Sequence, residues 1–432
     1  MKLGKKVVVD GFNLAMPKGT GVASYARSLT QSLKMLNCDI GILYGMNISR
    51  RTSMALREVI FFDSLDGERG PRRVYPLSAR WWSNQLSSIS GYRAVEIPVM
   101  GRVEARGFSS RLPEFNHLWN VTNLYNRASK HFRRTGRFLT VVMPNAPEIM
   151  HWTYPLPIQV KGAKNIYTIH DMVPLRLPYT TLDDKGYHYR LLRKIARQSD
   201  AICTVSDASR QDIISFFPEA ESRVHNTFQS FQTEISRNGS VSDEVSREVK
   251  ALFGLEREGY YLFFGSLEPK KNLGRLIEGF LAADVERPLV IVGAMAWKSD
   301  SELRFLEQGI AKKKIIRLEY LPRSALTALI SCARGVLFPS LSEGFGLPVL
   351  EALALGTPVL TSQEGALPEV AGDAAIYVNA YDAKSITQGI EKMDRDDLEI
   401  KRIRGLAADQ VKKFNMEVYC KNISNLYDWV SA

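Results

Sequence analysis

Cysteine is rare in this chain, with four residues among 432. They lie far apart, at Cys38, Cys203, Cys332 and Cys420. A disulfide-stabilised domain or a zinc site would need closer and more regular spacing. The sequence therefore predicts four reduced thiols in a protein of a reducing compartment.

Long hydrophobic runs are also missing. The longest obvious apolar stretch, residues 289–297, has nine residues, whereas a membrane-spanning helix needs about 20. The N-terminal residues MKLGKK lead directly into an apolar strand pattern and do not resemble the start of a signal peptide. We therefore expect a cytoplasmic protein without a membrane-spanning helix.

Several familiar cofactor and catalytic motifs are absent. The first glycine loop contains Gly19 and Gly21, but Ser24 stands where a dinucleotide-binding fingerprint would place its third glycine. The sequence has no Walker loop, nucleophile elbow or zinc-ligand spacing. Residues 394–396 spell Asp-x-Asp, but they lie in a charged connection without flanking strands. These absences argue against an NAD or FAD enzyme, a P-loop enzyme and a metal site.

Acidic residues are scarce in the first part of the chain. Residues 1–200 contain 30 Lys and Arg against 14 Asp and Glu, a balance of +16, whereas residues 201–432 have a balance of −5. An excess of positive charge confined to one half predicts an anionic partner for that half. A nucleic acid, a negatively charged membrane surface and a lipid diphosphate all fit this pattern.

Basic and aromatic residues are interleaved between positions 80 and 137. They include Arg80, Arg102, Arg106, Arg111, Arg127, Lys130, Arg133, Arg134 and Arg137, with Trp81, Trp82, Phe108, Phe115, Trp119, Tyr125 and Phe132. One interpretation is a membrane-interfacial surface, because Lys and Arg attract anionic headgroups and Trp and Tyr favour the interface. The other is an irregular acceptor-side subdomain whose aromatic residues form its core. The sequence leaves both open.

Strand and helix patterns alternate along the chain, which indicates parallel sheets. In the first part, strands are expected at 7–10, 40–44, 139–142, 166–169 and 201–205, with a helix at 22–36. In the second part, strands are expected at 260–264, 289–292, 315–318, 336–338, 359–361 and 375–378. We expect an N-terminal domain at 1–235, a linker at 236–258 with a short helix at 243–255, a second domain at 259–405 and a helical segment at 406–432.

The most informative segment is residues 335–368, GVLFPSLSEGFGLPVLEALALGTPVLTSQEGALP. It predicts a strand, a glycine loop, a helix that begins at Pro348 and is closed by Gly356, and a second strand. In open α/β sheets, phosphorylated ligands bind at the carboxyl ends of strands, where the amides of a helix start attract anions. Glu343 in the loop and Glu351 in the expected first helical turn flank this place. The alternative is an ordinary strand–helix–strand unit whose acids are solvated or suit the helix dipole.

The pattern E-G-F-G-L-P-x-L-E-A-x-A-x-G-x-P-V, with its two acids eight positions apart, resembles the E-x7-E signature of retaining nucleotide-sugar glycosyltransferases of the GT4 type. That family includes many bacterial polysaccharide mannosyl- and glucosyltransferases. The resemblance implies an α/β protein with the GT-B fold: two doubly wound Rossmann-like domains, a cleft between them and a C-terminal helix that crosses back to the first domain. It is strong over the second half of the chain and weak over the first.

The resemblance also implies a donor-binding set in which Glu351 hydrogen-bonds the ribose and Glu343, which we also expect to be catalytic, holds hydroxyls of the donor sugar. Lys271, in a segment resembling G-x-L-E-P-R-K-N-L, and the loop amides would stabilise the departing diphosphate. The complete set is Gly21, Ser266, Lys271, Glu343, Gly344, Phe345, Gly346, Leu347 and Glu351. Many relatives carry Arg where Ser266 and Lys270 stand here, so one cation is missing or relocated. A solvated lysine pair, and a tight turn at Gly21, are the alternatives from the residues alone.

Two histidines of the first part are candidates for the reaction centre. Thr168-Ile169-His170-Asp171 resembles the T-x-H-D/T segment of the same family, which implies that His170 lines the reacting face and is catalytic. His151 follows the preceding apolar pattern and is a candidate for the acceptor side. An ordinary core histidine is the alternative for His151.

The resemblance implies a metal-independent retaining hexosyltransferase. We expect transfer of a hexosyl group, mannose first, from GDP-mannose or UDP-glucose to a hydroxyl of a glycan or of a polyprenyl-diphosphate-linked oligosaccharide in cell-surface polysaccharide synthesis. No metal and no separate general base is expected, because the leaving phosphate accepts the proton. The basic half suits an anionic membrane surface on the inner face of the plasma membrane, and no nucleic-acid partner is expected. The alternatives are a sugar-nucleotide epimerase of the same fold and a non-catalytic basic binding protein.

Overall fold

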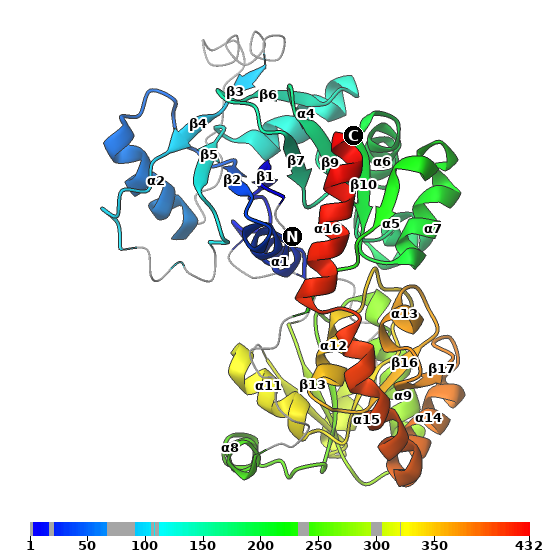
Figure 1. The fold of residues 1–432 in the computed structure, drawn as a ribbon. Helices are drawn as coiled ribbons and strands as arrows, with labels where there is room; N and C mark the ends of the chain where they lie inside the picture. Colours follow the sequence, from blue (N-terminus) through cyan, green and yellow to red (C-terminus); the bar gives the residue numbers. More distant parts are fainter. Residues whose placement is uncertain are drawn as a thin grey trace.

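The computed structural model describes residues 3–16, 21–66, 91–104, 108, 112–231, 242–294, 305–319 and 321–432. The chain forms two α/β domains, one above the other in Figure 1, and the final helix of the chain runs back along the first domain. The fold is therefore the two-domain α/β architecture expected from the sequence.

The first domain is built on an eight-stranded sheet with the order β11-β10-β9-β7-β1-β2-β5-β4. Its strands are β1 (Lys6–Asp10), β2 (Asp39–Tyr44), β4 (Val95–Ile97), β5 (His117–Asn120), β7 (Ile149–Trp152), β9 (Lys164–Thr168), β10 (Ala201–Thr204) and β11 (Val224–Asn226). All neighbouring pairs are parallel except β4 and β5. The central strand β1 is fully buried from Val7 to Asp10, because helices cover both faces of a parallel sheet.

Helices and a small second sheet complete the first domain. The helices are α1 (Gly21–Met35), α2 (Met54–Asp66), α4 (Leu124–Thr135), α5 (Val173–Arg176), α6 (Lys185–Gln198) and α7 (Asp207–Phe216), with 3₁₀ turns η2 (Pro178–Thr180) and η3 (Pro218–Arg223). The small sheet contains β3 (Tyr92–Arg93), β6 (Leu139–Val142) and β8 (Ile158–Val160). The predicted strand at 139–142 therefore exists, but it lies outside the main sheet.

The basic section is more ordered than the sequence predicted, which corrects the expectation of an irregular segment. It contains β4, β5 and α4, and α4 forms because Leu124, Ala128 and Phe132 recur every four residues and bury one face. Trp119 and Phe132 are buried in the domain core. These aromatic side chains are therefore core residues rather than an exposed interfacial belt. Arg80, Trp81, Trp82, Arg106 and Arg111 lie outside the described residues.

The second domain has a six-stranded parallel sheet with the order β14-β13-β12-β15-β16-β17. Its strands are β12 (Tyr261–Phe264), β13 (Leu289–Val292), β14 (Ile315–Leu318), β15 (Gly335–Phe338), β16 (Val359–Ser362) and β17 (Ala375–Val378). All six were predicted, within one residue at each end. In chain order this is the 3-2-1-4-5-6 arrangement of a dinucleotide-binding fold, whose connections diverge between β12 and β15.

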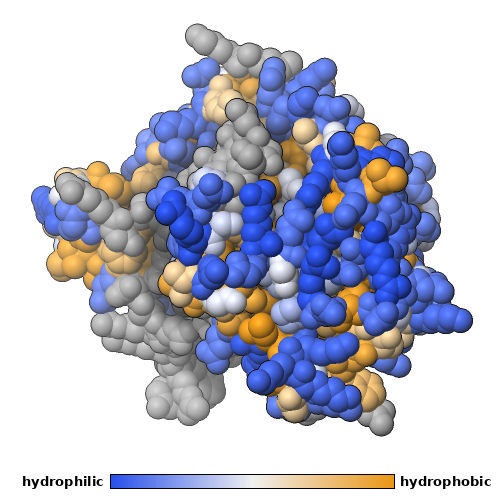
Figure 2. Space-filling view, turned by 90° about the horizontal axis from the view of Figure 1, so that it is seen from below, coloured by the Kyte–Doolittle hydropathy of each residue, from blue (hydrophilic) through white to orange (hydrophobic). Residues whose placement is uncertain are grey.

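The helices of the second domain pack on both faces of that sheet. They are α8 (Asp243–Phe253), α9 (Leu273–Ala282), α10 (Leu306–Ala311), α11 (Arg323–Cys332), α12 (Leu347–Ala354), α13 (Leu367–Ala371), α14 (Ala383–Arg395) and α15 (Asp397–Lys412), with the 3₁₀ turn η4 (Pro269–Lys271). Helix α8, predicted within the linker, packs on α11 of this domain. The outer surface seen in Figure 2 is mainly hydrophilic, as expected for helices that bury one face only.

The C-terminal helical region is divided into two helices. Helix α15 packs on the second domain, whereas α16 (Met416–Ser431) packs on α1 of the first. Asn415 caps α16, and its side chain accepts a hydrogen bond from the Val418 amide. The expected crossing back to the first domain is therefore made by α16.

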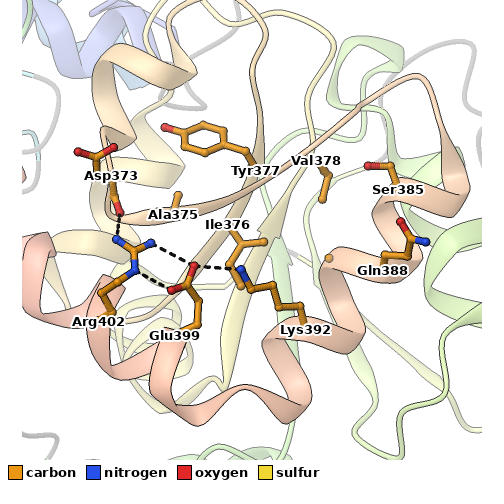
Figure 3. A pocket seen from close by; sticks show the side chains of 11 residues that line it. Asp373, Ala375, Ile376, Tyr377, Val378, Ser385, Gln388, Lys392, Glu399 and Arg402 are labelled. Atoms are coloured by element: carbon orange, nitrogen blue, oxygen red, sulfur yellow. Dashed lines mark hydrogen bonds and ion pairs between the residues drawn. The ribbon is translucent and has the colours of Figure 1, made fainter.

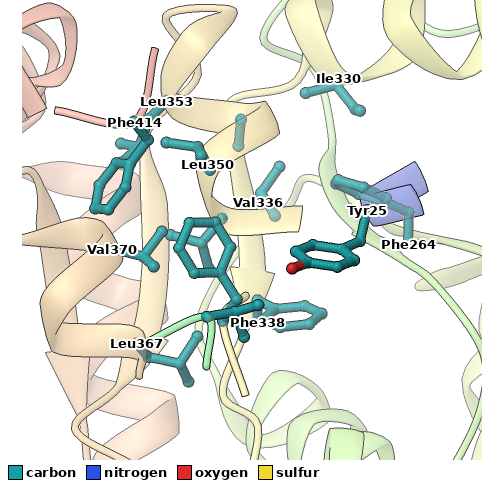
Figure 4. Packing of buried hydrophobic residues seen from close by; sticks show 14 of the residues in the cluster. Tyr25, Phe264, Ile330, Val336, Phe338, Leu350, Leu353, Leu367, Val370 and Phe414 are labelled. Carbon is teal, nitrogen blue, oxygen red and sulfur yellow. The ribbon is translucent and has the colours of Figure 1, made fainter. Parts of the chain in front are cut away.

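One hydrophobic cluster extends from the first domain into the second. It includes Tyr25 of α1, Phe338 of β15 and Phe345 of the following loop. Figure 4 shows Leu350 and Leu353 of α12, Leu367 and Val370 of α13, and Phe414 from the α15–α16 connection. The loop that follows β15 is thus packed against apolar side chains from several elements, which holds its backbone in place.

Candidate active site between the two domains

The site lies where two loops leave the carboxyl ends of β12 and β15. The first loop leads from Gly265 into η4, and the second leads from Pro339 into α12. A hydrogen bond of 2.8 Å from the Leu341 amide to the Lys270 carbonyl joins the loops. Ligands of doubly wound sheets bind at this divergence of the strand connections. The topology therefore brings the two predicted motifs together.

Lys271 and Glu343 form an ion pair at the centre of the site. Nζ of Lys271 donates a hydrogen bond of 2.6 Å to Oε1 of Glu343. The exposed fractions of the two residues are 9% and 7%, and the ammonium group also lies 5.0 Å from the centre of the Phe338 ring. Both charged groups are thus largely removed from water, and each neutralises the charge of the other. A bound diphosphate and sugar would offer each of them a further partner.

Glu351 lies on α12, the helix that follows the loop containing Glu343. The helix begins at Leu347 after Gly346, so Glu351 is its fifth residue and lies in the second turn. The expectation that it lies in the first turn is wrong, because the helix contains no acidic residue there. Burial raises the pKa of Glu351, whereas Arg323, which donates a 2.8 Å hydrogen bond to Oε1, lowers it.

The loop backbone has the conformation needed to present its amides. Gly346 has φ +104° at the start of α12, where a side chain would be strained. The side chain of Phe345 turns away from the site and packs on Phe414 at 5.3 Å between ring centres. Leu347 lies near Gly21, because a Cβ added at Gly21 would be 3.9 Å from its side chain. The described end of the first glycine loop therefore lies opposite the second-domain loop, and Gly19 and Thr20 lie outside the described residues.

His170 lies directly across the domain boundary from Gly344. A Cβ added at Gly344 would come 2.2 Å from the His170 carbonyl oxygen, so only glycine fits this approach. Ser209 Oγ donates a hydrogen bond of 2.8 Å to the same carbonyl. The predicted catalytic histidine and the acidic loop are therefore brought together.

The His170 ring has a defined neutral tautomer. Nε2 lies 2.9 Å from the Thr153 carbonyl, which can only accept, so Nε2 carries the proton. Burial lowers the pKa of His170, partly offset by this hydrogen bond and by Asp171. Tyr25 packs edge-on against the ring at 4.9 Å. The ring is therefore neutral near pH 7, with Nδ1 as its hydrogen-bond acceptor.

Two contacts across the domain boundary were not predicted from sequence. The Glu369 carboxylate accepts hydrogen bonds from the amides of Asp207 and Ala208, at 2.8 and 2.6 Å, at the start of α7. Lys270 Nζ lies 3.7 Å from Oδ2 of Asp171. Leu367 and Val370 of the same helix, α13, are buried in the core, whereas Glu369 reaches the other domain. The only sequence signal for the Glu369 contact was the general preference of a carboxylate for the start of a helix.

His151 does not line the acceptor side, which corrects that prediction. The residue is fully buried, with Nδ1 2.8 Å from the Tyr427 hydroxyl and Nε2 2.8 Å from the Thr168 hydroxyl. Burial lowers its pKa to about 3. His151 therefore belongs to the packing of α16 on the first domain, as an ordinary core histidine does.

Other candidate residues have local partners. Ser266 is exposed, and its hydroxyl bonds to the Glu268 carboxylate. Oδ1 of Asp394 accepts hydrogen bonds from Tyr261 and Arg287, both at 2.6 Å. Among the described residues, no three His, Cys, Asp or Glu side chains are grouped so as to hold a metal ion. Asp394 is thus a structural residue.

Two of the pockets in the described part of the chain are similar in size. One, of about 420 Å³, lies beside His170 and is formed by both domains. The other, of about 380 Å³, lies on the second domain alone, between β17, α14 and α15 (Figure 3). In the latter, Arg402 and Lys392 hold the pKa of Glu399 at about 2, and these charges satisfy one another. Of these two pockets, only the first adjoins the predicted site residues.

Comparison with known proteins identifies the family of the chain. Residues 246–407 match the family described as glycosyl transferases group 1. O-antigen chain mannosyltransferase B of Escherichia coli is 33% identical over 280 residues, which are 63% of this chain and 71% of that protein. The chain belongs to the group 1 glycosyltransferases. Serotype-specific mannosyltransferase WbdA of Escherichia coli is 28% identical over 61% of this chain, which spans only 33% of WbdA.

Solved structures show the same fold for this glycosyltransferase. Anabaena HepE in complex with UDP and glucose has a TM-score of 0.63 at 13% identity, with 98% of each chain covered. WaaG, a glycosyltransferase of lipopolysaccharide biosynthesis, has a TM-score of 0.58 at 13% identity, covering 97% of this chain and 98% of WaaG. The fold is GT-B. Within the described residues, no helix is both long and apolar enough to cross a bilayer.

Proposed function

We propose that this glycosyltransferase transfers a mannosyl group from GDP-mannose to a hydroxyl of a saccharide acceptor, with retention of the anomeric configuration, in cell-surface polysaccharide synthesis. UDP-glucose is the second candidate donor. The observation that carries the proposal is the buried pair of Lys271 and Glu343, beside the divergence of the second sheet and opposite His170. Mannose is favoured because several relatives are named mannosyltransferases.

In the proposed reaction, the bond from the sugar C1 to the donor phosphate oxygen breaks while a bond from C1 to the acceptor oxygen forms. The acceptor proton passes to the departing phosphate. Lys271 and the amides of Gly346 and Leu347 stabilise the diphosphate, because they present positive charge where negative charge develops. Glu343 holds sugar hydroxyls, and Glu351 holds the ribose. His170 lines the reacting face from the first domain.

The direct test supplies radiolabelled GDP-mannose and UDP-glucose to the protein and to its Glu343→Gln variant. Release of labelled mannose or labelled product by the parent, at least a hundredfold faster than by the variant, supports the proposal. If the parent consumes neither donor, the proposal fails. NMR of the product then reports the anomeric configuration, and activity that survives EDTA supports the proposed independence from a metal.

We also propose peripheral association with an anionic membrane, on the inner face of the plasma membrane. Arg134 and Arg137 are exposed at the end of α4, whereas Arg133 pairs with Asp184 at 2.8 Å and lies over the Tyr187 ring. Exposed arginines attract anionic headgroups at about 1 kcal/mol each. Arg134→Glu with Arg137→Glu is expected to reduce sedimentation with anionic vesicles, and equal sedimentation would contradict this association.

A further inference from the structure

The 420 Å³ pocket lies at the divergence of strand connections in the first sheet. There β1 pairs with β2 on one side and with β7 on the other. The loop after β7 contributes Tyr154, and the segment after β9 contributes His170 and Asp171. Helix α6 and the residues before it contribute His188 and Asp183. The pocket thus occupies the ligand-binding position of its own sheet.

The second domain closes the pocket. Glu268 and Lys270 line it from the loop after β12, and Lys270 faces Asp171 across the domain boundary at 3.7 Å. His170, whose carbonyl meets Gly344, belongs to the lining as well. A molecule in the pocket therefore lies next to the loop that carries Glu343.

The charges in the pocket are mainly negative. Asp171, Asp183 and Glu268 contribute three carboxylates, against the single ammonium group of Lys270. Burial lowers the pKa of both His170 and His188, which are therefore neutral near pH 7. A phosphate or diphosphate group would be repelled here, since like charges in a partly desolvated site raise the free energy of binding.

Two polar groups are available to a ligand. Nε2 of His188 is buried and has no hydrogen-bond partner among the described residues. Asp183 is exposed and has no ion-pair partner in the part of the chain that the structure describes. Hydroxyl groups can donate to a carboxylate and can either donate to or accept from an imidazole. The side chain of Tyr154 adds an aromatic surface for the apolar face of a sugar ring.

We propose that this pocket binds the neutral saccharide end of the acceptor, that Asp183 and His188 determine its specificity, and that phosphate-bearing groups are excluded. The inference rests on the proposed function, since it names the acceptor of that reaction. If the acceptor is linked to a lipid diphosphate, the diphosphate lies outside this pocket.

The test is saturation-transfer NMR on the full chain in saturating GDP, with methyl α-D-mannopyranoside and mannose 6-phosphate as probes. The neutral sugar is expected to bind, and the phosphate ester is expected to bind at least tenfold more weakly. Asp183→Asn and His188→Ala should each weaken binding of the neutral sugar at least fivefold. Asp183→Asn should also reduce the difference in affinity between the two probes. Equal binding of the two probes by the parent, or unchanged binding in both variants, would overturn the proposal.

Asp409→Asn and His131→Ala are matched controls, because neither residue lines the pocket. Both controls should bind the probes as the parent does. Calorimetry with GDP and UDP on the same proteins separates the two hypotheses. Pocket variants that bind the nucleotide normally but no longer bind the neutral sugar support the inference. A parent that binds neither nucleotide would instead contradict the proposed function.

Discussion

Nζ of Lys271 lies 2.6 Å from Oε1 of Glu343, and this contact joins residues 72 positions apart. Removing one member leaves a buried charge without its partner, which costs about 3–5 kcal/mol in such pairs. Lys271→Met and Glu343→Gln are therefore each expected to lower the free energy of unfolding by about 3–5 kcal/mol. The double variant should recover most of that loss. Urea unfolding of the four proteins gives the coupling energy, and purely additive losses would refute the pairing.

Gly344 lies against the His170 carbonyl, so its replacement should separate the domains at the reaction centre. A methyl group at this position would lie 2.2 Å from that oxygen. We expect Gly344→Ala to reduce transfer at least tenfold and to increase the radius of gyration in solution scattering. Gly405→Ala is the control, because nothing lies within 4 Å of the added Cβ there. Normal activity of Gly344→Ala would show that this close contact is unnecessary.

His151 predicts a pH dependence of stability. Its folded pKa is about 3, below the unfolded value of about 6.5. The unfolded chain therefore binds the proton more readily, and the contribution present above pH 6.5 is lost as the pH falls toward 3. Between pH 7 and pH 5 the loss is about 2 kcal/mol, at about 1.4 kcal/mol per unit. Denaturant unfolding at both pH values should show a loss about 2 kcal/mol larger in the parent than in His151→Gln, because His170 and His188, whose pKa values are also lowered, contribute equally to both proteins. Equal pH dependence in the two proteins would count against the assignment.

Sequence patterns predicted the second domain well for a physical reason. Strands buried on both faces, such as β13 and β15, are continuous apolar runs bounded by charged or turn residues, and such runs are hard to mistake. The glycine loop and Glu343 were placed correctly because they follow directly from one of these strands. The first residue of α12 was less certain, since Leu347 and Pro348 both suit a helix start, and this shifted Glu351 into the wrong turn.

Contacts between distant parts of the chain were beyond the sequence. From the sequence, His151 was a candidate for the acceptor side. In the structure its ring contacts Tyr427 of α16, which lies 276 positions away. The contact of Glu369 with the amides of α7 could not be predicted either, because those amides lie 162 and 161 positions away in the other domain. In the basic section, the sequence showed which residues were aromatic, but only the packed structure showed that Trp119 and Phe132 face the core.

The most direct measurement is calorimetric binding of GDP and UDP to the parent and to Glu351→Gln. Glu351 is held at the second turn of α12 and pairs with Arg323 at 2.8 Å, where we assign the ribose of the donor. The account predicts that the parent binds one of the two nucleotides and that Glu351→Gln weakens this binding at least tenfold, about 1.4 kcal/mol. Equal affinity in the two proteins would contradict a donor site between β12 and β15.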